Sequence, residues 1–458
     1  MEDMKNGKRS SFSGKLGYVL AAAGASVGLG NIWRFPYLAA KYGGGIFLII
    51  YIVLALTFGY TMIVAETAIG RMTRKSPVGA FKSFGKKKWL SFGGWINAVI
   101  PVLIVPYYSV IGGWVIKYLV EYFRGNAKLL AEDGYFTDFI SNGVSTELCF
   151  VAFCAFTLII IFAGVQNGIE RVSKIMMPIL IVLSVIIAVY SVTRPGALAG
   201  VKYFLVPNVK NFSWMTVVSA MGQMFYSLSI AMGILITFGS YMKKDTAIED
   251  STRNVEIFDT GIAIMAGLMI IPAVFAFSGG DPDTLQAGPS LMFITIPKVF
   301  QNMGFGTVIG IVFFVLVLFA AVTSSIALTE SAVSTFEDEL GWGRKKATVL
   351  VGVIMLVLGS LSSLGYGPLA GIKIIGMQFL DLFDFLTNSV MMPIAALITS
   401  LLVSRVVGID KIEEEIIHGE SAFRRKKVFV VMIKYLCPVF AIIILLSSVA
   451  NALGWIKM

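Results

Sequence analysis

Long runs of apolar residues alternate with short polar segments along the whole chain. Eleven of these runs are long enough to cross a bilayer, because a membrane-spanning helix needs roughly 20 apolar residues. The pattern therefore predicts an all-α polytopic membrane protein. The expected transmembrane helices are 15–38, 42–70, 89–124, 147–166, 170–193, 214–242, 255–279, 304–336, 346–364, 372–406 and 428–454.

Composition agrees with this pattern. The 458 residues are 57% hydrophobic and only 14% charged, whereas soluble domains are about one quarter charged. The spans leave no room for a separate soluble domain. The first run is long and follows a basic segment, so we expect a retained helix and no signal peptide.

The net charge of +10 is unevenly distributed. If the N-terminus is cytoplasmic, most of the 37 Lys and Arg residues fall on that side. This positive-inside pattern predicts a cell-membrane protein with a cytoplasmic N-terminus and an extracytoplasmic C-terminus. The basic excess thus indicates topology, with some affinity for anionic lipid, and nucleic acid is not an expected partner.

Several kinds of chemistry lack their residues. Cys149, Cys154 and Cys437 lie within or at the edge of apolar runs and form neither a disulfide framework nor a metal motif. The single histidine, His418, is expected to be solvated in the charged loop 408–427. No GxxxxGK[ST] phosphate loop and no nucleophile–base pairing occur, so we expect neither an ATP-driven pump nor an enzyme.

The first apolar run contains "GASVGLGNIWRFPY" at residues 24–37. Gly24 and Gly28 form a GxxxG, which by itself indicates close helix packing. Packing does not explain Gly30 and Pro36, which weaken a helix and remove a backbone donor. Freed backbone groups are tolerated in mid-membrane only inside protein or beside a polar cavity. The interruption therefore predicts a binding site.

A second interruption, "GQMFYSLSIAMG" at residues 222–233, lies in the sixth run and contains Gln223, Ser227 and Ser229. Interruptions at matching positions of two repeats are typical of transporters whose site lies near the membrane midplane. We therefore expect a 5+5 inverted repeat in which helices 1 and 6 are broken. The expected parts are a cytoplasmic tail (1–14), a first repeat (15–193), a second repeat (214–406) and an eleventh helix (428–454).

Both interruptions, together with "AAVTSSIAL" at 320–328 and "FEDEL" at 336–340, resemble the neurotransmitter:sodium symporter family. The most similar members are prokaryotic amino acid transporters such as the bacterial leucine transporter. The resemblance covers nearly the whole chain, and the motifs occur in the family's order. It implies the 5+5 fold and sodium-coupled import of an amino acid by alternating access.

The resemblance implies a first sodium site made by the Ser26 carbonyl, the Asn31 side-chain oxygen, Ser227 and Asp259. The substrate carboxylate would complete it. A mid-membrane carboxylate costs roughly 2.5–3.5 kcal/mol on insertion scales, so Asp259 is expected to have a function or a partner. It would supply the charge that animal members obtain from chloride, which predicts chloride independence. Asn254 is an alternative ligand, and a capping or helix-pairing role for Asp259 is also open.

A second sodium site is implied at the carbonyls of Gly24, Val27 and Ala320 and the hydroxyls of Thr323 and Ser324. Two sodium ions per substrate are therefore expected. The alternative is that these hydroxyls bond to carbonyls of their own helix.

The substrate is expected to be a free amino acid, because half-helix N-termini suit a carboxylate. The resemblance places the carboxylate at the backbone of Leu29 and Gly30 and at the Tyr108 hydroxyl. The ammonium would meet the carbonyls of Ser26, Tyr226 and Ser227 and the hydroxyl of Ser229.

The side-chain pocket is expected to be apolar, which predicts neutral hydrophobic amino acids. Gly28 stands where monoamine transporters place an aspartate, which argues against monoamine substrates. The expected wall is Ile104, Tyr108, Tyr226, Met232, Ser324 and Leu328.

Two gates follow from the resemblance. Arg34 and Asp384 match the family's outer ion pair, above Tyr108 and Tyr226. On the inner side, Arg9 and Asp338 match the pair that tethers the tail, with Phe12 nearby; alternatively, Asp338 only balances the basic residues 344–346.

Three further features concern residues outside these sites. Glu66 resembles a buried glutamate that supports the two breaks. Gly168 and Pro178 fit a Gly-x9-Pro pattern found in family members, and the resemblance implies that the fifth span can unwind to admit water to the second sodium. Glu330 is an intramembrane acid without an assigned role.

The competing hypothesis is an amino acid sensor on the same fold that binds without transport. Such a sensor predicts a disabled sodium site or an added signalling domain, and the sequence shows neither. No obligatory protein partner is indicated.

Overall fold

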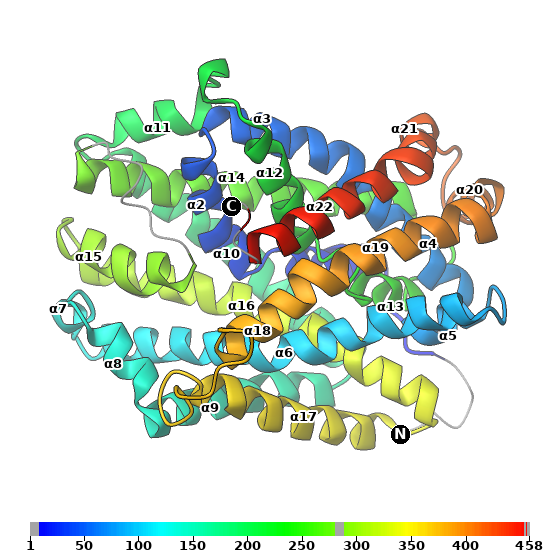
Figure 1. Cartoon of the computed structure of the whole chain (residues 1–458), viewed down its shortest axis with the longest axis horizontal. Helices are drawn as coiled ribbons and strands as arrows, with labels where there is room; N and C mark the ends of the chain where they lie inside the picture. Colours follow the sequence, from blue (N-terminus) through cyan, green and yellow to red (C-terminus); the bar gives the residue numbers. More distant parts are fainter. Residues whose placement is uncertain (1–8, 280–287, 453–454, 456–458) are drawn as a thin grey trace.

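Long helices form most of the structure, a computed structural model that describes residues 9–279, 288–452 and 455 (Figure 1). The start of the predicted tail, residues 1–8, and the end of the eleventh predicted helix, residues 453–454, lie outside the described residues.

Nine helices in the described parts of the chain are long and apolar enough to cross a membrane without a break. Several contain a π-helical turn, so one span carries more than one element label. The nine are Gly45–Thr73 (α3, η2, α4), Lys88–Phe123 (α6), Gly143–Phe162 (α9), Val165–Val192 (η3, α10), Ile248–Ser278 (α14), Gly306–Leu340 (α16), Arg344–Leu364 (α17), Phe379–Val407 (α18, η7, α19, η8) and Lys426–Asn451 (α21, η9, α22).

The first and sixth predicted spans are broken. The first consists of α1 (Lys15–Ser26), then η1 (Gly30–Arg34) with α2 (Phe35–Lys41), bent by 53°. The sixth consists of α12 (Trp214–Ser227) and α13 (Ile234–Ser240), separated by residues 228–233. The all-α membrane fold with breaks in helices 1 and 6 is confirmed, while the repeat boundaries remain a prediction.

The sequence does not predict the short helices in the connections, because each is too short to show a helical period. They lie between the spans. They are α5 (Pro77–Lys82), α7 (Ala127–Leu130), α8 (Tyr135–Ser141), α11 (Ala197–Leu205), η4 (Val209–Asn211), η6 (Leu291–Thr295), α15 (Ile296–Gln301) and α20 (Ile409–Ile417).

The broken first span lies inside the bundle. Every residue from Gly17 to Ser26 of α1 is buried, and α1 packs against α10, α14 and α16. The helices α9 and α17 lie side by side at the lower edge of Figure 1 and pack on α6, which in turn packs along α16. Neighbouring helices therefore shield the break from lipid, as interrupted backbone in a membrane requires.

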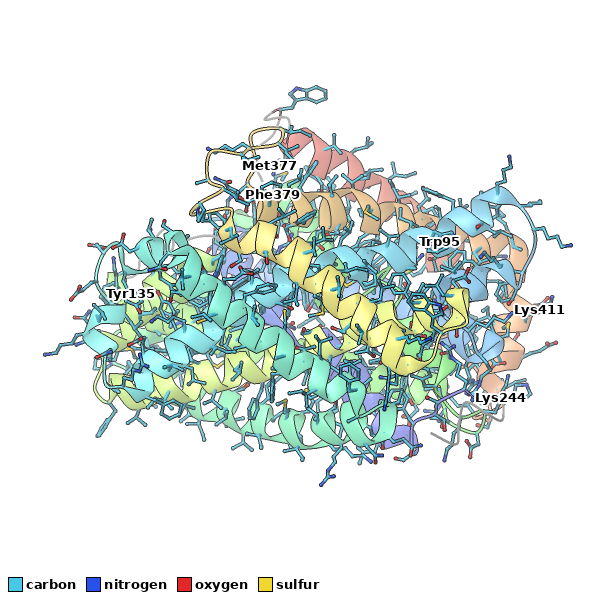
Figure 2. The ribbon with its side chains drawn as sticks, turned by 90° about the horizontal axis from the view of Figure 1, so that it is seen from below. Trp95, Tyr135, Lys244, Met377, Phe379 and Lys411 are labelled. Carbon is cyan, nitrogen blue, oxygen red and sulfur yellow. The ribbon has the colours of Figure 1, made fainter. Side chains whose placement is uncertain are left out.

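The two ends of the bundle carry different loops. Figure 2 shows Lys244 and Lys411 near one end of the long axis and Tyr135 near the other. The positive-inside pattern predicts that the first end faces the cytoplasm.

We expect Glu132→Cys, beside Tyr135, to react with an impermeant maleimide in intact cells, and Lys411→Cys to react only after permeabilisation. Both positions are exposed. The background carries Cys149→Ser, because Cys149 is the one native cysteine that is not fully buried. The reverse labelling pattern would refute the proposed orientation.

Candidate functional site

The first break begins where α1 ends. Val27 adopts an extended backbone conformation, which stops the helix after Ser26. The Gly28 N–H donates to Asn31 Oδ1 at 3.2 Å, and the Leu29 N–H donates to the Tyr108 hydroxyl at 3.3 Å. Side chains thus satisfy backbone donors that the interrupted helix leaves free.

The second break is strained. Ser229 and Ala231 both have positive φ, 53° and 59°, which non-glycine residues adopt rarely and at a cost of order 1–3 kcal/mol. Glu66 Oε1 accepts the Ala231 N–H at 2.8 Å. The Glu66 side chain, on the second span, thereby holds the non-helical segment of the sixth span in place.

The two breaks also bind each other. The Gln223 side chain donates to the Gly30 carbonyl at 3.0 Å, and the Ser229 hydroxyl donates to the Ala25 carbonyl at 3.0 Å. Main-chain oxygens freed in one span therefore find donors in the other.

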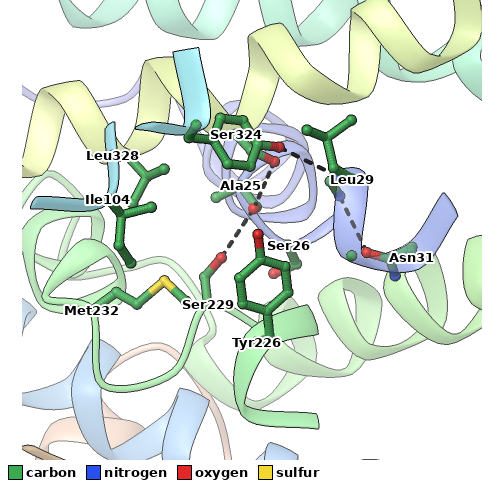
Figure 3. Close-up of a pocket in the computed structure, with 13 residues that line it drawn as sticks. Ala25, Ser26, Leu29, Asn31, Ile104, Tyr226, Ser229, Met232, Ser324 and Leu328 are labelled. Carbon is green, nitrogen blue, oxygen red and sulfur yellow. Dashed lines mark hydrogen bonds between the residues drawn. The ribbon is translucent and has the colours of Figure 1, made fainter. Parts of the chain in front are cut away.

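A small cavity lies between the breaks (Figure 3), with about 20 Å³ available to the centres of water-sized spheres. Its polar side is main chain and hydroxyls, and its other side is apolar. Of the predicted substrate residues, all line it except Ser227. The lining is Ala25, Ser26, Gly28, Leu29, Gly30, Asn31, Ile104, Tyr108, Tyr226, Ser229, Met232, Ser324 and Leu328.

Two glycines let side chains of neighbouring helices pack closely against the first break. A Cβ at Gly28 would lie 2.6 Å from Ser324 Oγ and 3.1 Å from the Tyr108 hydroxyl. A Cβ at Gly30 would lie 2.4 Å from the Tyr226 ring. Larger residues at either position would displace groups that line the cavity.

Asp259 is buried beside the first break among three donors. Asn31 Nδ2 and Ser227 Oγ each donate to Asp259 Oδ1 at 2.8 Å, and the Tyr51 hydroxyl donates to Oδ2 at 3.0 Å. The structure thus brings three of the four predicted first-site residues together, while Ser26 lines the cavity. Asn31 turns its amide nitrogen, not its oxygen, toward the carboxylate. Tyr51 was not predicted, because a tyrosine in an apolar run looks like core.

The predicted second-site residues also converge. The Ser324 hydroxyl lies 3.3 Å from the Gly24 carbonyl oxygen and 3.4 Å from that of Val27. Thr323 Oγ1 donates to the Ala320 carbonyl at 3.2 Å, within its own helix. The two hydroxyls therefore differ. Thr323 bonds to a carbonyl of its own helix, whereas Ser324 contacts carbonyl oxygens of the first span. Five oxygen groups of this kind suit a hard cation.

The tail packs against the end of the bundle that the sequence predicts to be cytoplasmic, called the inner side below. Arg9 Nη1 donates to both oxygens of Asp338, at 2.6 and 2.7 Å. Phe12 is 1% exposed and meets Tyr18, Phe238 and Tyr241 edge-on. An ion pair and a buried ring thus hold the tail under the cavity.

Glu330 acquires a partner that the sequence did not reveal. It accepts from the Tyr241 hydroxyl at 2.7 Å and from two nitrogens of Arg344, at 3.0 and 2.5 Å. Arg344 also donates to the Ile161 carbonyl. This buried carboxylate therefore joins four helices and orients the Tyr241 ring, over which Arg9 lies.

The outer pair is not formed. Arg34 lies over the Tyr226 ring at 5.5 Å, while Asp384 accepts from Tyr107 at 3.2 Å and from Asn388 at 2.5 Å. Among the described residues no ion pair joins Arg34 to Asp384, so their gate role remains a prediction. Tyr107 and Asn388 were not predicted.

The described residues contain no group of three or more His, Cys, Asp or Glu that could hold a metal ion. A buried cavity between two broken helices, with carbonyl and hydroxyl clusters beside it, is typical of secondary transporters. The chain belongs to the sodium:neurotransmitter symporter family, whose model matches residues 9–130 and 137–455. It is therefore a multi-pass transporter-family protein and not an enzyme.

Similar proteins occur in several organisms. The sodium-dependent transporter YhdH of Bacillus subtilis is 34% identical over 97% of this chain and 99% of its own. The human sodium- and chloride-dependent GABA transporter 2 is 26% identical over 89% of this chain and 75% of its own. The crystal structure of MhsT in complex with L-phenylalanine matches with a TM-score of 0.86 and 34% identity, over 96% of this chain and 100% of that one.

We expect Asp259→Asn to raise the sodium concentration needed for half-maximal thermal stabilisation of the purified protein about tenfold or more. A ligand that binds only the folded state stabilises it, and a bond to a charged group contributes about 1.5–3 kcal/mol. The exposed Glu414→Gln is the control. An unchanged sodium dependence in Asp259→Asn would remove this residue from the ion site.

Proposed function

We propose that the protein imports neutral hydrophobic amino acids by sodium symport, with two sodium ions per substrate, no chloride requirement and alternating access. The observation that carries the proposal is the cavity itself, closed off by two broken helices and lined on one side by main-chain dipoles. Such a cavity suits a zwitterion with an apolar side chain. No charged side chain lines it.

The substrate assignment follows from the lining. The backbone at Leu29 and Gly30 with the Tyr108 hydroxyl suits a carboxylate, and the Ser229 hydroxyl with nearby carbonyls suits an ammonium. Ile104, Met232 and Leu328 are almost fully buried and would contact the side chain. MhsT, of similar fold, was crystallised with L-phenylalanine, which supports this substrate class.

Asp259 supports chloride independence. It places a fixed negative charge 2.8 Å from Ser227 Oγ and 3.0 Å from the Tyr51 hydroxyl. In this role it would balance sodium without a mobile anion, in contrast to the relative that is named chloride-dependent.

Two sodium ions would give the transporter a strong driving force. At a tenfold gradient and about 100 mV, two ions supply roughly 7 kcal/mol, and one ion supplies about half of that. Alternating access then requires the Arg9–Asp338 contact to break while the outer side closes at Arg34 and Asp384.

We expect proteoliposomes containing the protein to accumulate leucine, methionine or an aromatic amino acid when sodium is higher outside. Replacing external sodium with potassium should abolish uptake, while replacing chloride with gluconate should leave it unchanged. Binding without accumulation would indicate the sensor. Uptake that rises strongly with added chloride at fixed sodium would refute the role given to Asp259.

We expect Tyr108→Phe to weaken amino acid binding about tenfold, because a hydrogen bond to a charged group contributes about 1.5 kcal/mol or more. The matched control is Tyr118→Phe, whose hydroxyl donates to the Phe293 carbonyl away from the cavity. The measurement is displacement of a radiolabelled amino acid in saturating sodium. Equal affinity in both variants would show that the Tyr108 hydroxyl does not contact the substrate.

A further inference from the structure

The start of α6 carries positive charge that the described part of the chain does not neutralise. The three lysines at 86–88 are exposed, and among the described residues none of them has an acidic partner. The sequence contains no Asp or Glu between Glu66 and Glu121. Lys82, which precedes these lysines, differs from them, because its ammonium lies 2.6 Å from a carboxylate oxygen of Glu339. The counter-charge of the three lysines therefore comes from outside the described residues.

Large aromatic side chains follow the lysines on the same face of α6. Lys88, Phe92 and Trp95 are spaced four and three residues apart, so their side chains lie along one side of the helix. Phe92 is 55% exposed and Trp95 is 41% exposed. Trp95 has a contact within the protein, because the Lys82 ammonium lies 5.8 Å from its ring centre. Positive charge at the start of the helix is therefore followed by exposed apolar surface further along the span.

Both features lie where α6 enters the predicted membrane. The apolar span begins at Lys88, and Figure 2 shows Trp95 toward the end of the bundle that carries Lys411. Exposed tryptophan is typical of the interface between headgroups and acyl chains, and lysine is typical of its cytoplasmic side. The lysines at 86–88 with Phe92 and Trp95, called the lysine–aromatic patch below, therefore lie at the depth of the headgroups.

The span that contains α19 adds a cation at the same depth. The Tyr107 hydroxyl of α6 donates to Asp384 at 3.2 Å, and a Cβ at Gly93 would lie 2.4 Å from Ile398. The two spans are therefore antiparallel and in close contact. Arg405, seven residues beyond Ile398, is exposed and has no acidic partner among the described residues. Because of the antiparallel pairing, it lies at the level of the residues that precede Gly93.

We propose that the lysine–aromatic patch binds the headgroup of an anionic phospholipid in preference to a zwitterionic one. The lysine ammonium groups suit the negative charge of the headgroup, and the rings of Phe92 and Trp95 suit the glycerol and the first acyl carbons. A soluble anion would reach the lysines but would leave the aromatic surface without a partner. The predicted orientation places this lipid in the cytoplasmic leaflet. The proposal does not depend on the proposed transport function.

The test measures quenching of tryptophan fluorescence in the purified full chain, reconstituted into phosphatidylcholine vesicles. A fixed fraction of the lipid is phosphatidylglycerol or phosphatidylcholine with bromine on one acyl chain, and bromine quenches the tryptophans that it contacts. Each protein is measured with and without Trp95→Phe, so that the difference reports Trp95 alone. The patch variant replaces the lysines at 86–88 with glutamine. The matched control, Lys411→Gln with Arg424→Gln and Lys427→Gln, also removes three exposed positive charges.

We expect brominated phosphatidylglycerol to quench Trp95 at about a tenfold lower lipid fraction than brominated phosphatidylcholine. The reason is that each Lys or Arg near a membrane surface strengthens binding of anionic lipid about fivefold. The patch variant should lose this preference, and the control should retain it. Higher salt should weaken the preference, since exposed charges are screened. The replaced lysines are exposed and unpaired, so the patch variant is expected to unfold at the same temperature as wild type.

Equal quenching of Trp95 by the two brominated lipids would overturn the proposal, because it would show lipid contact without selection of a headgroup. A preference that survives removal of the three lysines would assign the selection to other residues and reject the patch. Equal loss of the preference in the patch variant and in the control would also overturn it, because the overall charge of this end of the bundle would then be responsible.

Discussion

Backbone groups freed in the middle of a membrane must find partners inside the protein, and the rest of this structure depends on that constraint. Each break exposes N–H and C=O groups that lipid cannot satisfy. Side chains from other helices satisfy them. Glu66 accepts the Ala231 N–H, Gln223 donates to the Gly30 carbonyl, and the Tyr108 hydroxyl accepts the Leu29 N–H. These partners fix two half-helices against each other, and the space between them is the cavity.

The same logic governs buried charge. A carboxylate away from water is costly unless it is hydrogen-bonded or paired. Asp259 has three donors at the first break, and Glu330 has Arg344 and Tyr241 at the inner end. Arg71, fully buried, pairs with Glu415 at 2.7 Å and so fastens α20 to the second span. These three buried carboxylates therefore lie either beside the cavity or at a contact between helices.

The two sides of the cavity are closed differently. On the inner side an ion pair, a buried phenylalanine and the Glu330 cluster act together, whereas on the outer side Arg34 rests on Tyr226 without reaching Asp384. A partly exposed ion pair contributes only about 0–1 kcal/mol. The contact at this end therefore owes most of its strength to packing around Phe12.

The sequence by itself determined the class of fold and the place of both breaks, and the resemblance to the family supplied most of the residues that line the cavity. These features have local signals in the sequence. The bilayer fixes the length of an apolar run, and each break contains its own glycine, proline or hydroxyl-bearing residues. Only the tertiary structure decided which distant groups meet. Tyr51 joined Asp259, Arg344 joined Glu330, and Arg34 stayed apart from Asp384. The sequence around a tyrosine, an arginine or a glutamate in a helix does not show which residue it will contact. Contacts between segments far apart in the chain form only when the helices pack.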